Sequence, residues 1–152
     1  MNYLYPRLDL EFETRNLKLF FSIQGGDFTK AGLLSSEVKK VLKQLNIENK
    51  TIKSVVIALY EAEVNVVAHA YRGTVDVEID ENKITILVSD EGPGIPDVEL
   101  AMKPGYSTAS TSVREMGFGA GMGLPNIKKN TDEMWIETVV GRGTRVKMLN
   151  YF

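Results

Sequence analysis

The sequence predicts an α+β fold in which helices pack on one face of a mixed, mostly antiparallel sheet. Short segments with alternating apolar and polar residues predict strands, and two longer segments with apolar residues every three or four positions predict helices. The order is strands, two helices, a hairpin, a short helix, a loop, another helix and a last hairpin. The 152 residues have the usual size of one domain, so we expect residues 1–152 to form a single two-layer unit.

The first elements are two strands followed by two helices. Leu8–Phe12 and Leu17–Ile23 alternate between apolar and polar residues, which is typical of strands. Residues 33–47 carry an apolar stripe at helical spacing and predict an amphipathic helix. The next helix begins near residue 49, is apolar around much of its circumference, and is expected to stop at Gly73.

The second half of the chain predicts two hairpins with a loop and helices between them. Asp97 is expected to cap a short helix at residues 98–103, and residues 104–122, rich in Gly, Ser and Thr, predict a loop. A further helix is expected from residue 123. The four strands of the two hairpins are residues 74–80, 83–90, 133–140 and 143–151.

Composition excludes several classes of protein. The net charge of -2 and the lack of a long basic stripe argue against a nucleic-acid or anionic-membrane surface. The absence of cysteine excludes disulfides, thiolate catalysis and cysteine-based metal sites, and it suits a reducing cytoplasm. No apolar run is long enough to cross a bilayer, and the first residues have no signal-peptide pattern. We therefore expect a cytoplasmic protein.

Three polar residues recur at four-residue steps along the second predicted helix. Glu61, Asn65 and His69 therefore lie on one face of an otherwise apolar helix. One interpretation is that this face meets solvent. The other is that the Asn65 oxygen binds a hard cation such as Mg²⁺ and that Glu61 acts as a general base. A lone histidine such as His69 is interpreted as a structural residue.

The stretch "SDEGPGIPD" (Ser89 to Asp97) follows directly from a predicted strand. It fits a strand-ending turn. It also fits a binding site, because Gly92 and Gly94 allow close approach to the backbone while Pro93 stiffens it. Asp90 at the strand end can accept a hydrogen bond from an exocyclic amine, such as the amine of adenine.

A second glycine cluster, "GFGAGMG" (Gly117 to Gly123), immediately precedes a predicted helix. Free backbone N–H groups at such a place can bind an anion, although a flexible hinge would explain the glycines equally well. The cluster is neither a P-loop nor a dinucleotide fingerprint, since no Gly-Lys-Ser/Thr follows it and no strand precedes it.

The motifs in this order resemble the GHKL ATPase superfamily. "EAEVNVVAHAY" (Glu61 to Tyr71) is similar to its N-box, "DEGPGIPD" to its first glycine box, "GAGMGLPNIKK" to its second, and "GRGT" to its last short motif. The resemblance spans roughly residues 15–150. The segments "HAY", "DVELAMKPGYST" and "LPNIKKNTDE" further resemble the bacterial anti-sigma-factor serine kinases, the SpoIIAB, RsbW and RsbT type.

The resemblance implies a Bergerat fold that holds ATP and Mg²⁺ beneath a mobile lid at residues 104–118. It implies that Glu61 is the catalytic base, that Asn65 binds the metal ion, and that Asp90 contacts the adenine amine. Gly92 and Gly94 would line the adenine pocket with Thr144 nearby. The residues carried over as cofactor-binding are Asn65, Asp90, Gly92, Gly94, Gly119, Gly121, Gly123, Leu124 and Thr144, with Arg114 as a phosphate contact in the lid.

The implied function is that of a protein serine/threonine kinase that phosphorylates a STAS-domain antagonist. The implied partners are this STAS-domain protein and, in alternation with it, a sigma factor. An alternative is a non-catalytic, ATP-gated binding module whose affinity for a partner changes when the lid closes. A histidine-kinase catalytic domain is disfavoured because no dimerisation helix with a phosphorylatable histidine fits in residues 1–60. A gyrase-like or MutL-like ATPase is disfavoured because no transducer domain is expected after the ATP-binding unit. Relatives of this kind commonly dimerise through the sheet or an N-terminal segment, so the resemblance leaves room for a homodimer.

Overall fold

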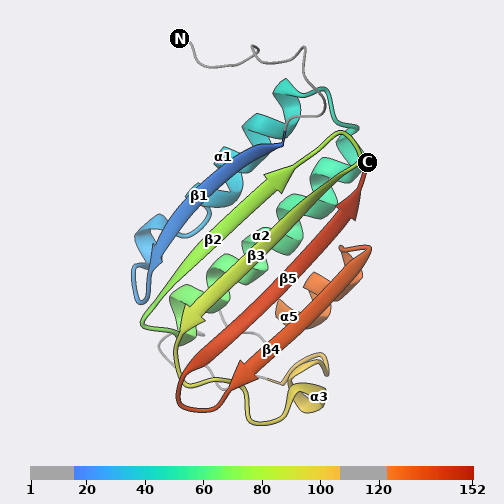
Figure 1. The fold of residues 1–152 in the computed structure, drawn as a ribbon. Coiled ribbons are helices and arrows are strands. Elements are labelled where there is room, and N and C mark those ends of the chain that lie inside the picture. The colour runs from blue at the N-terminus through green and yellow to red at the C-terminus, as the bar shows by residue number, and fades with distance from the viewer. Residues whose placement is uncertain (1–15, 107–122) are drawn as a thin grey trace.

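The computed structural model describes residues 16–106 and 123–152, and these form a sheet with helices on one face (Figure 1). The predicted α+β, two-layer architecture is confirmed. The predicted strand Leu8–Phe12 lies outside the described residues. The elements are β1 (Leu17–Gln24), the 3₁₀ helix η2 (Phe28–Lys30), α1 (Leu33–Gln44), α2 (Asn49–His69), β2 (Arg72–Ile79), β3 (Lys83–Glu91), α3 (Val98–Ala101), α5 (Gly123–Lys129), β4 (Glu133–Val139) and β5 (Gly143–Tyr151).

The sheet has the strand order β1-β2-β3-β5-β4, and each neighbouring pair in the described part of the chain is antiparallel. The two predicted hairpins, β2–β3 and β4–β5, are therefore joined through β3 and β5. The register pairs Asp90 with Gly73 and Ser89 with Arg145. The end of β3, the start of β2 and the start of β5 consequently meet at one end of the sheet.

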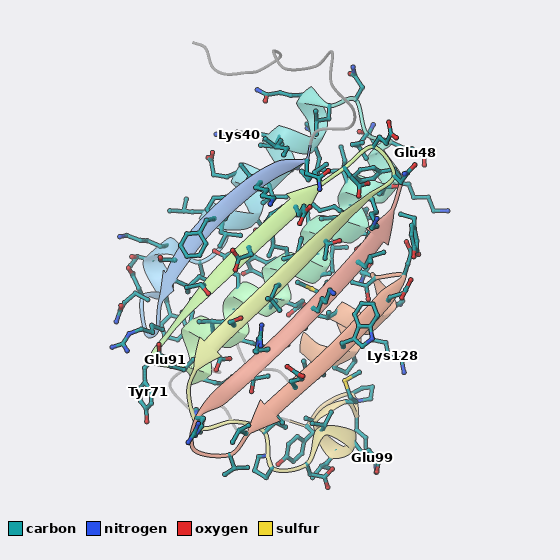
Figure 2. All side chains as sticks on the ribbon, in the orientation of Figure 1. Lys40, Glu48, Tyr71, Glu91, Glu99 and Lys128 are labelled. Atoms are coloured by element: carbon teal, nitrogen blue, oxygen red, sulfur yellow. The ribbon has the colours of Figure 1, made fainter. Side chains whose placement is uncertain are left out.

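The core lies between the sheet and the helices. Alternate residues of β2 and β3 point into it, as the period-two pattern requires. On the opposite face no described helix covers the sheet, and Figures 1 and 2 show that face open. The alternation of burial along β1, β4 and β5 assigns the exposed side chains of Phe20, Trp135 and Tyr151 to this face. The fully buried side chains of the core include Val38, Leu42, Val55, Leu59, Val75, Ile84, Ile127 and Met148.

Helix α2 ends at His69, so the expectation that it stops at Gly73 is wrong. The chain enters β2 at once, because the Tyr71 N–H donates to the Glu91 carbonyl oxygen at 2.8 Å. Gly73 lies inside β2, where a Cβ would stand 2.8 Å from Val66 Cγ1. The glycine thus lets α2 approach the sheet closely, whereas the sequence pattern made it look like a helix stop.

A buried carboxylate joins α1 to α2. Glu63 on α2 is 3% exposed, and its carboxylate accepts hydrogen bonds from Gly32 N at 2.9 Å, Ser35 N at 3.3 Å and Leu34 N at 3.4 Å. These N–H groups have no partner within a helix because they open its first turn. A negative charge at this position is also favoured by the helix dipole. Glu63 therefore fixes the start of α1 against α2.

None of the described helices is both long enough and apolar enough to cross a membrane.

Candidate functional site

Asp90 stands near the end of β3, where the sequence placed it. Its Oδ1 accepts a hydrogen bond from the Thr144 backbone N–H at 3.1 Å. Burial raises the pKa of the Asp90 carboxyl, and the Thr144 N–H partly opposes that rise. No described residue hydrogen-bonds Oδ2, so one oxygen is held by the sheet and the other can accept a bond from a ligand.

Thr144 supports this arrangement through its backbone and its hydroxyl. It is 8% exposed on β5, and its Oγ1 lies 3.0 Å from Thr138 Oγ1 on β4. Thr138 Oγ1 also accepts a hydrogen bond from Ile95 N at 2.8 Å. The paired hydroxyls therefore tie the segment that follows Asp90 to the β4–β5 hairpin.

Gly92 lies where α2 ends. Its N–H donates to the Arg142 carbonyl oxygen at 3.1 Å, and a Cβ built on it would stand 3.1 Å from Ala70 Cα and 3.3 Å from Asp90 Oδ1. A side chain here would push against the end of α2 and crowd the carboxylate. The predicted role of Gly92, to clear room beside Asp90, is compatible with this packing.

Gly94 is constrained by its own backbone as well as by its neighbours. Its φ of +76° lies in the left-handed region that favours glycine. A Cβ would stand 2.6 Å from the Val139 carbonyl oxygen, and the adjacent Pro93 carbonyl accepts a bond from Gly141 N at 2.8 Å. The glycine-rich turn is therefore held against the turn between β4 and β5.

Glu61 is half-buried on α2 and faces α5. Its Oε2 accepts a hydrogen bond from Asn126 Nδ2 at 2.9 Å. Its Oε1 has no partner among the described residues. The polar face that the sequence predicts on α2 therefore meets α5 at Asn126, and one Glu61 carboxylate oxygen has no partner among the described residues.

Asn65 lies one helical turn after Glu61, also half-buried. A Cβ on Gly123, the first residue of α5, would stand 3.0 Å from Asn65 Oδ1, so α5 begins directly against this amide. Within the described part of the chain the Asn65 amide makes no hydrogen bond. A half-buried amide oxygen without a partner among the described residues fits a hard cation.

His69 occupies the last position of α2, one turn beyond Asn65. Burial lowers the pKa of its imidazole. The neutral form is therefore favoured near pH 7, which agrees with the interpretation of His69 as a structural residue.

The polar residues of α2 and the Asp90 carboxylate lie at the same end of the molecule. Val66, which follows Asn65, packs on Gly73, and Gly73 pairs with Asp90 across the sheet. Figure 2 labels Glu91, which follows Asp90, and Tyr71, which follows the end of α2, close together at this end. The site is thus built from α2, β3, β5 and the start of α5.

Several predicted site residues cannot be placed. Gly119, Gly121 and Arg114 lie outside the described residues, and of the predicted lid only residues 104–106 are described. Leu124 is described, but its side chain is 8% exposed and belongs to the core. Its place in the site is therefore to anchor the beginning of α5.

Sequence reasoning missed two residues that shape the site. Asn126 contacts Glu61 although 65 positions separate them, and its only signal was a polar residue between the apolar Leu124 and Ile127. Gly143 belongs to the "GRGT" motif, and the sequence pattern assigns it no role of its own. A Cβ on Gly143 would stand 2.0 Å from the Asp90 carbonyl oxygen, so only glycine lets β5 approach β3 there.

The chain is similar to a known domain family and to several known proteins. The sequence pattern of the histidine kinase-like ATPase domain matches residues 27–149. The anti-sigma F factor of Caldanaerobacter subterraneus subsp. tengcongensis is 39% identical over 113 residues, which cover 71% of this chain and 76% of the relative. The serine/threonine-protein kinase RsbT of Bacillus subtilis is 30% identical over 117 residues, covering 74% and 82%. The anti-sigma F factor of Clostridium novyi is 34% identical over 117 residues, covering 73% and 78%.

Proposed function

Because the chain belongs to the histidine kinase-like ATPase domain family, we propose that it is an ATP-dependent protein serine/threonine kinase that also acts as an anti-sigma regulatory factor. The similarity to RsbT supports kinase activity, and the similarity to two anti-sigma F factors supports binding of a sigma factor. We further propose that the phosphate acceptor is a STAS-domain antagonist protein.

The adenine subsite would be the end of β3. Asp90 Oδ2 would accept a hydrogen bond from the adenine amine, while Thr144 N–H holds Oδ1 at 3.1 Å. Gly92 and Gly94 would leave the plane of the base accessible, and the Thr138–Thr144 hydroxyl pair would keep the pocket wall rigid. The observation that supports this assignment is the asymmetry of the carboxylate, which has one oxygen bound and the other without a described partner.

The phosphate end would lie between α2 and α5. Asn65 would bind through its amide oxygen a Mg²⁺ ion that, when bound, neutralises charge on the phosphates. Gly119, Gly121 and Gly123 would approach the phosphates through their backbone, and Arg114 would contact them from the lid. These roles are supported by the motif positions and by the Asn65 amide, which faces the start of α5 and makes no hydrogen bond to a described residue.

The observation that carries the kinase proposal is the position of Glu61, one turn from Asn65 with Oε1 unpaired among the described residues. Oε1 would accept the proton of the serine hydroxyl. The serine oxygen forms its bond to the γ-phosphorus as the bond from that phosphorus to the bridging oxygen of ADP breaks. Such transfer depends mainly on positioning and charge neutralisation.

The test is transfer of labelled phosphate from Mg-ATP to purified STAS-domain proteins of the source genome, with wild type and Glu61→Gln. We expect transfer to one of them, and a fall of roughly 10²- to 10⁴-fold in Glu61→Gln, which is the usual contribution of a general base. Nucleotide affinity should stay similar. Glu81→Gln, an exposed change in the β2–β3 turn, is the matched control and should behave as wild type.

Binding without transfer is the competing result. If wild type and Glu61→Gln both bind a partner in a nucleotide-dependent way and neither transfers phosphate, the protein is an ATP-gated binding module. If millimolar Mg-ADP fails to raise the melting temperature of the wild type, the nucleotide site itself is refuted.

A further inference from the structure

Asn126 is the hydrogen-bond partner that the described residues give Glu61. Its side-chain Nδ2 donates to Glu61 Oε2 at 2.9 Å. Two of the contacts between α5 and α2 are Gly123 against Asn65 and Asn126 against Glu61. Since these pairs run in opposite directions along the two helices, α5 lies antiparallel to α2 and supplies one contact to each polar residue.

The Asn126 side chain is presented by a well-anchored helix. Leu124 is 8% exposed and Ile127 is fully buried, so the residues around Asn126 fix α5 in the core. At the other end, Asn130 Nδ2 donates to the Asn126 carbonyl oxygen at 2.9 Å, and Asn150 Nδ2 on β5 donates to the Asn130 carbonyl oxygen at 2.9 Å. The first bond is local to the end of α5, and the second, made to a backbone carbonyl, ties that end to the sheet.

A carboxylate on a helix surface samples several rotamers unless another group fixes it. An amide N–H held at 2.9 Å from Oε2 restricts the Glu61 side chain and leaves Oε1 directed elsewhere. Because a general base must meet its proton at hydrogen-bond distance, loss of that restraint lowers the fraction of productive encounters. The contact therefore has a specific consequence for a reaction in which Glu61 is the base.

We infer that Asn126 is a positioning residue for phosphoryl transfer: its amide holds Glu61 Oε2 so that Oε1 takes the proton of the acceptor hydroxyl. The inference rests on the proposed kinase function. Asn126 acts through Glu61 and contacts neither nucleotide nor acceptor. Its effect should therefore fall on the rate of transfer and leave nucleotide binding alone.

The experiment compares Asn126→Ala and Asn126→Asp with wild type, using Mg-ATP and the STAS-domain acceptor found in the transfer screen. The aspartate variant keeps the shape of the side chain, loses the N–H donor and places a second carboxylate beside Glu61, so it remains informative if the alanine variant folds poorly. We expect kcat to fall roughly ten- to a hundredfold in both, with KM for ATP and Kd for ADP within about twofold of wild type.

The matched control is Asn130→Ala. It removes an amide of the same kind from the end of the same helix, and that amide bonds a backbone carbonyl rather than Glu61. Its kcat should equal that of wild type. An equal loss in Asn130→Ala would show that the Asn126 variants act by loosening α5, and it would overturn the inference.

A double variant provides the second measurement. If Asn126 acts through Glu61, then Asn126→Ala should cost little further rate in a Glu61→Gln background, because residues that act as a unit are not additive. Full additivity, or wild-type kcat in both Asn126 variants while Glu61→Gln is impaired, would refute the inference and leave the kinase proposal intact. Absence of transfer by the wild type to any acceptor would refute both.

Discussion

Replacing Asp90 with Asn should weaken nucleotide binding without weakening the fold. The Thr144 N–H is buried and needs an acceptor, so the amide oxygen of the introduced side chain should take the place of Oδ1 at 3.1 Å. The amide nitrogen then occupies the position of Oδ2 and presents N–H donors to the adenine amine, which is itself a donor. If the amide is flipped, its NH₂ group faces the Thr144 N–H, which is also a donor. Either orientation therefore leaves one donor facing another.

The size of the effect follows from the hydrogen bond that is lost. A bond to a charged group contributes about 1.5–3 kcal/mol, which corresponds to roughly a 10- to 100-fold loss of affinity. At an ADP concentration about 100 times the wild-type Kd, the wild type gains about 2.7 kcal/mol, and a variant with roughly 30-fold weaker binding gains about 0.9 kcal/mol. For a protein of this size these are shifts of about 5–11 °C and about 2–4 °C in melting temperature.

The assay is thermal unfolding with and without Mg-ADP, with Kd measured separately by calorimetry. Without nucleotide, Asp90→Asn should melt no lower than wild type, because burial already disfavours the charged form of Asp90. Asp97→Asn is the matched control. Asp97 caps α3 by accepting from Leu100 N at 3.1 Å, a role that Asn fills equally well. An ADP affinity within about twofold of wild type in Asp90→Asn would refute the adenine assignment.

Three further predictions follow from the same contacts. When ADP affinity is measured from pH 7 downward, the affinity of the wild type should fall as Asp90 takes up a proton, and the midpoint should lie above the ordinary pKa of aspartate. This Asp90-dependent fall should be absent in Asp90→Asn. Gly94→Ala and Gly141→Ala both place alanine at positive φ, which costs about 1–2 kcal/mol; only Gly94→Ala also drives a Cβ to 2.6 Å from backbone, so it should melt lower than Gly141→Ala. Glu63→Gln should lose about 1–3 kcal/mol of unfolding free energy, because the buried Glu63 carboxylate accepts hydrogen bonds from three backbone N–H groups. The control, Glu48→Gln at an exposed position, should change the unfolding free energy little, and both variants should bind ADP normally.

The sign of the pH prediction comes from the same geometry. Thr144 N–H holds Oδ1, so the proton that Asp90 gains must reside on Oδ2, which then becomes a donor, as in Asp90→Asn. A raised pKa means that the folded, nucleotide-free protein takes up this proton at a higher pH than an ordinary aspartate. The affinity for ADP is therefore highest at pH values above the pKa of Asp90 and is lost as the pH falls through that pKa. A flat profile down to about pH 4, the ordinary aspartate range, would contradict the proposed contact.

The sequence alone predicts a structural feature correctly when the pattern that indicates the feature lies in neighbouring residues. The alternation in β2, β3 and β5, the apolar stripe of α1 and the cap at Asp97 are local patterns, and the structure contains each of them. Gly73 shows the limit of such patterns. A glycine after a helix usually ends it, but here its purpose is to admit Val66 of α2 against β2, and that contact is set by packing.

The candidate site likewise combines residues that a local pattern reveals with residues that only the fold brings to them. Asp90 is recognisable because it ends a strand and precedes two glycines, and Glu61 and Asn65 because they share a helical face. Their supporting partners come from distant segments. Thr144 N–H reaches Asp90 across 54 positions, and Asn126 reaches Glu61 across 65 positions. Nothing local distinguishes such a partner from any other polar residue, so its role depends on the fold.

Glu61 and Glu63 give the sharpest case, because they are two positions apart on one helix and are chemically identical. Residues two apart on a helix point to different sides. One carboxylate therefore faces α1 and the other faces α5. Glu63 is 3% exposed, and its oxygens accept three N–H groups at the start of α1, so they are directed into the contact between the two helices. Glu61 has one oxygen held and one unpaired among the described residues. If Glu61→Gln abolishes transfer at unchanged stability while Glu63→Gln lowers stability at unchanged affinity, then occupancy of the carboxylate oxygens, rather than residue type, separates the catalytic glutamate from the structural one.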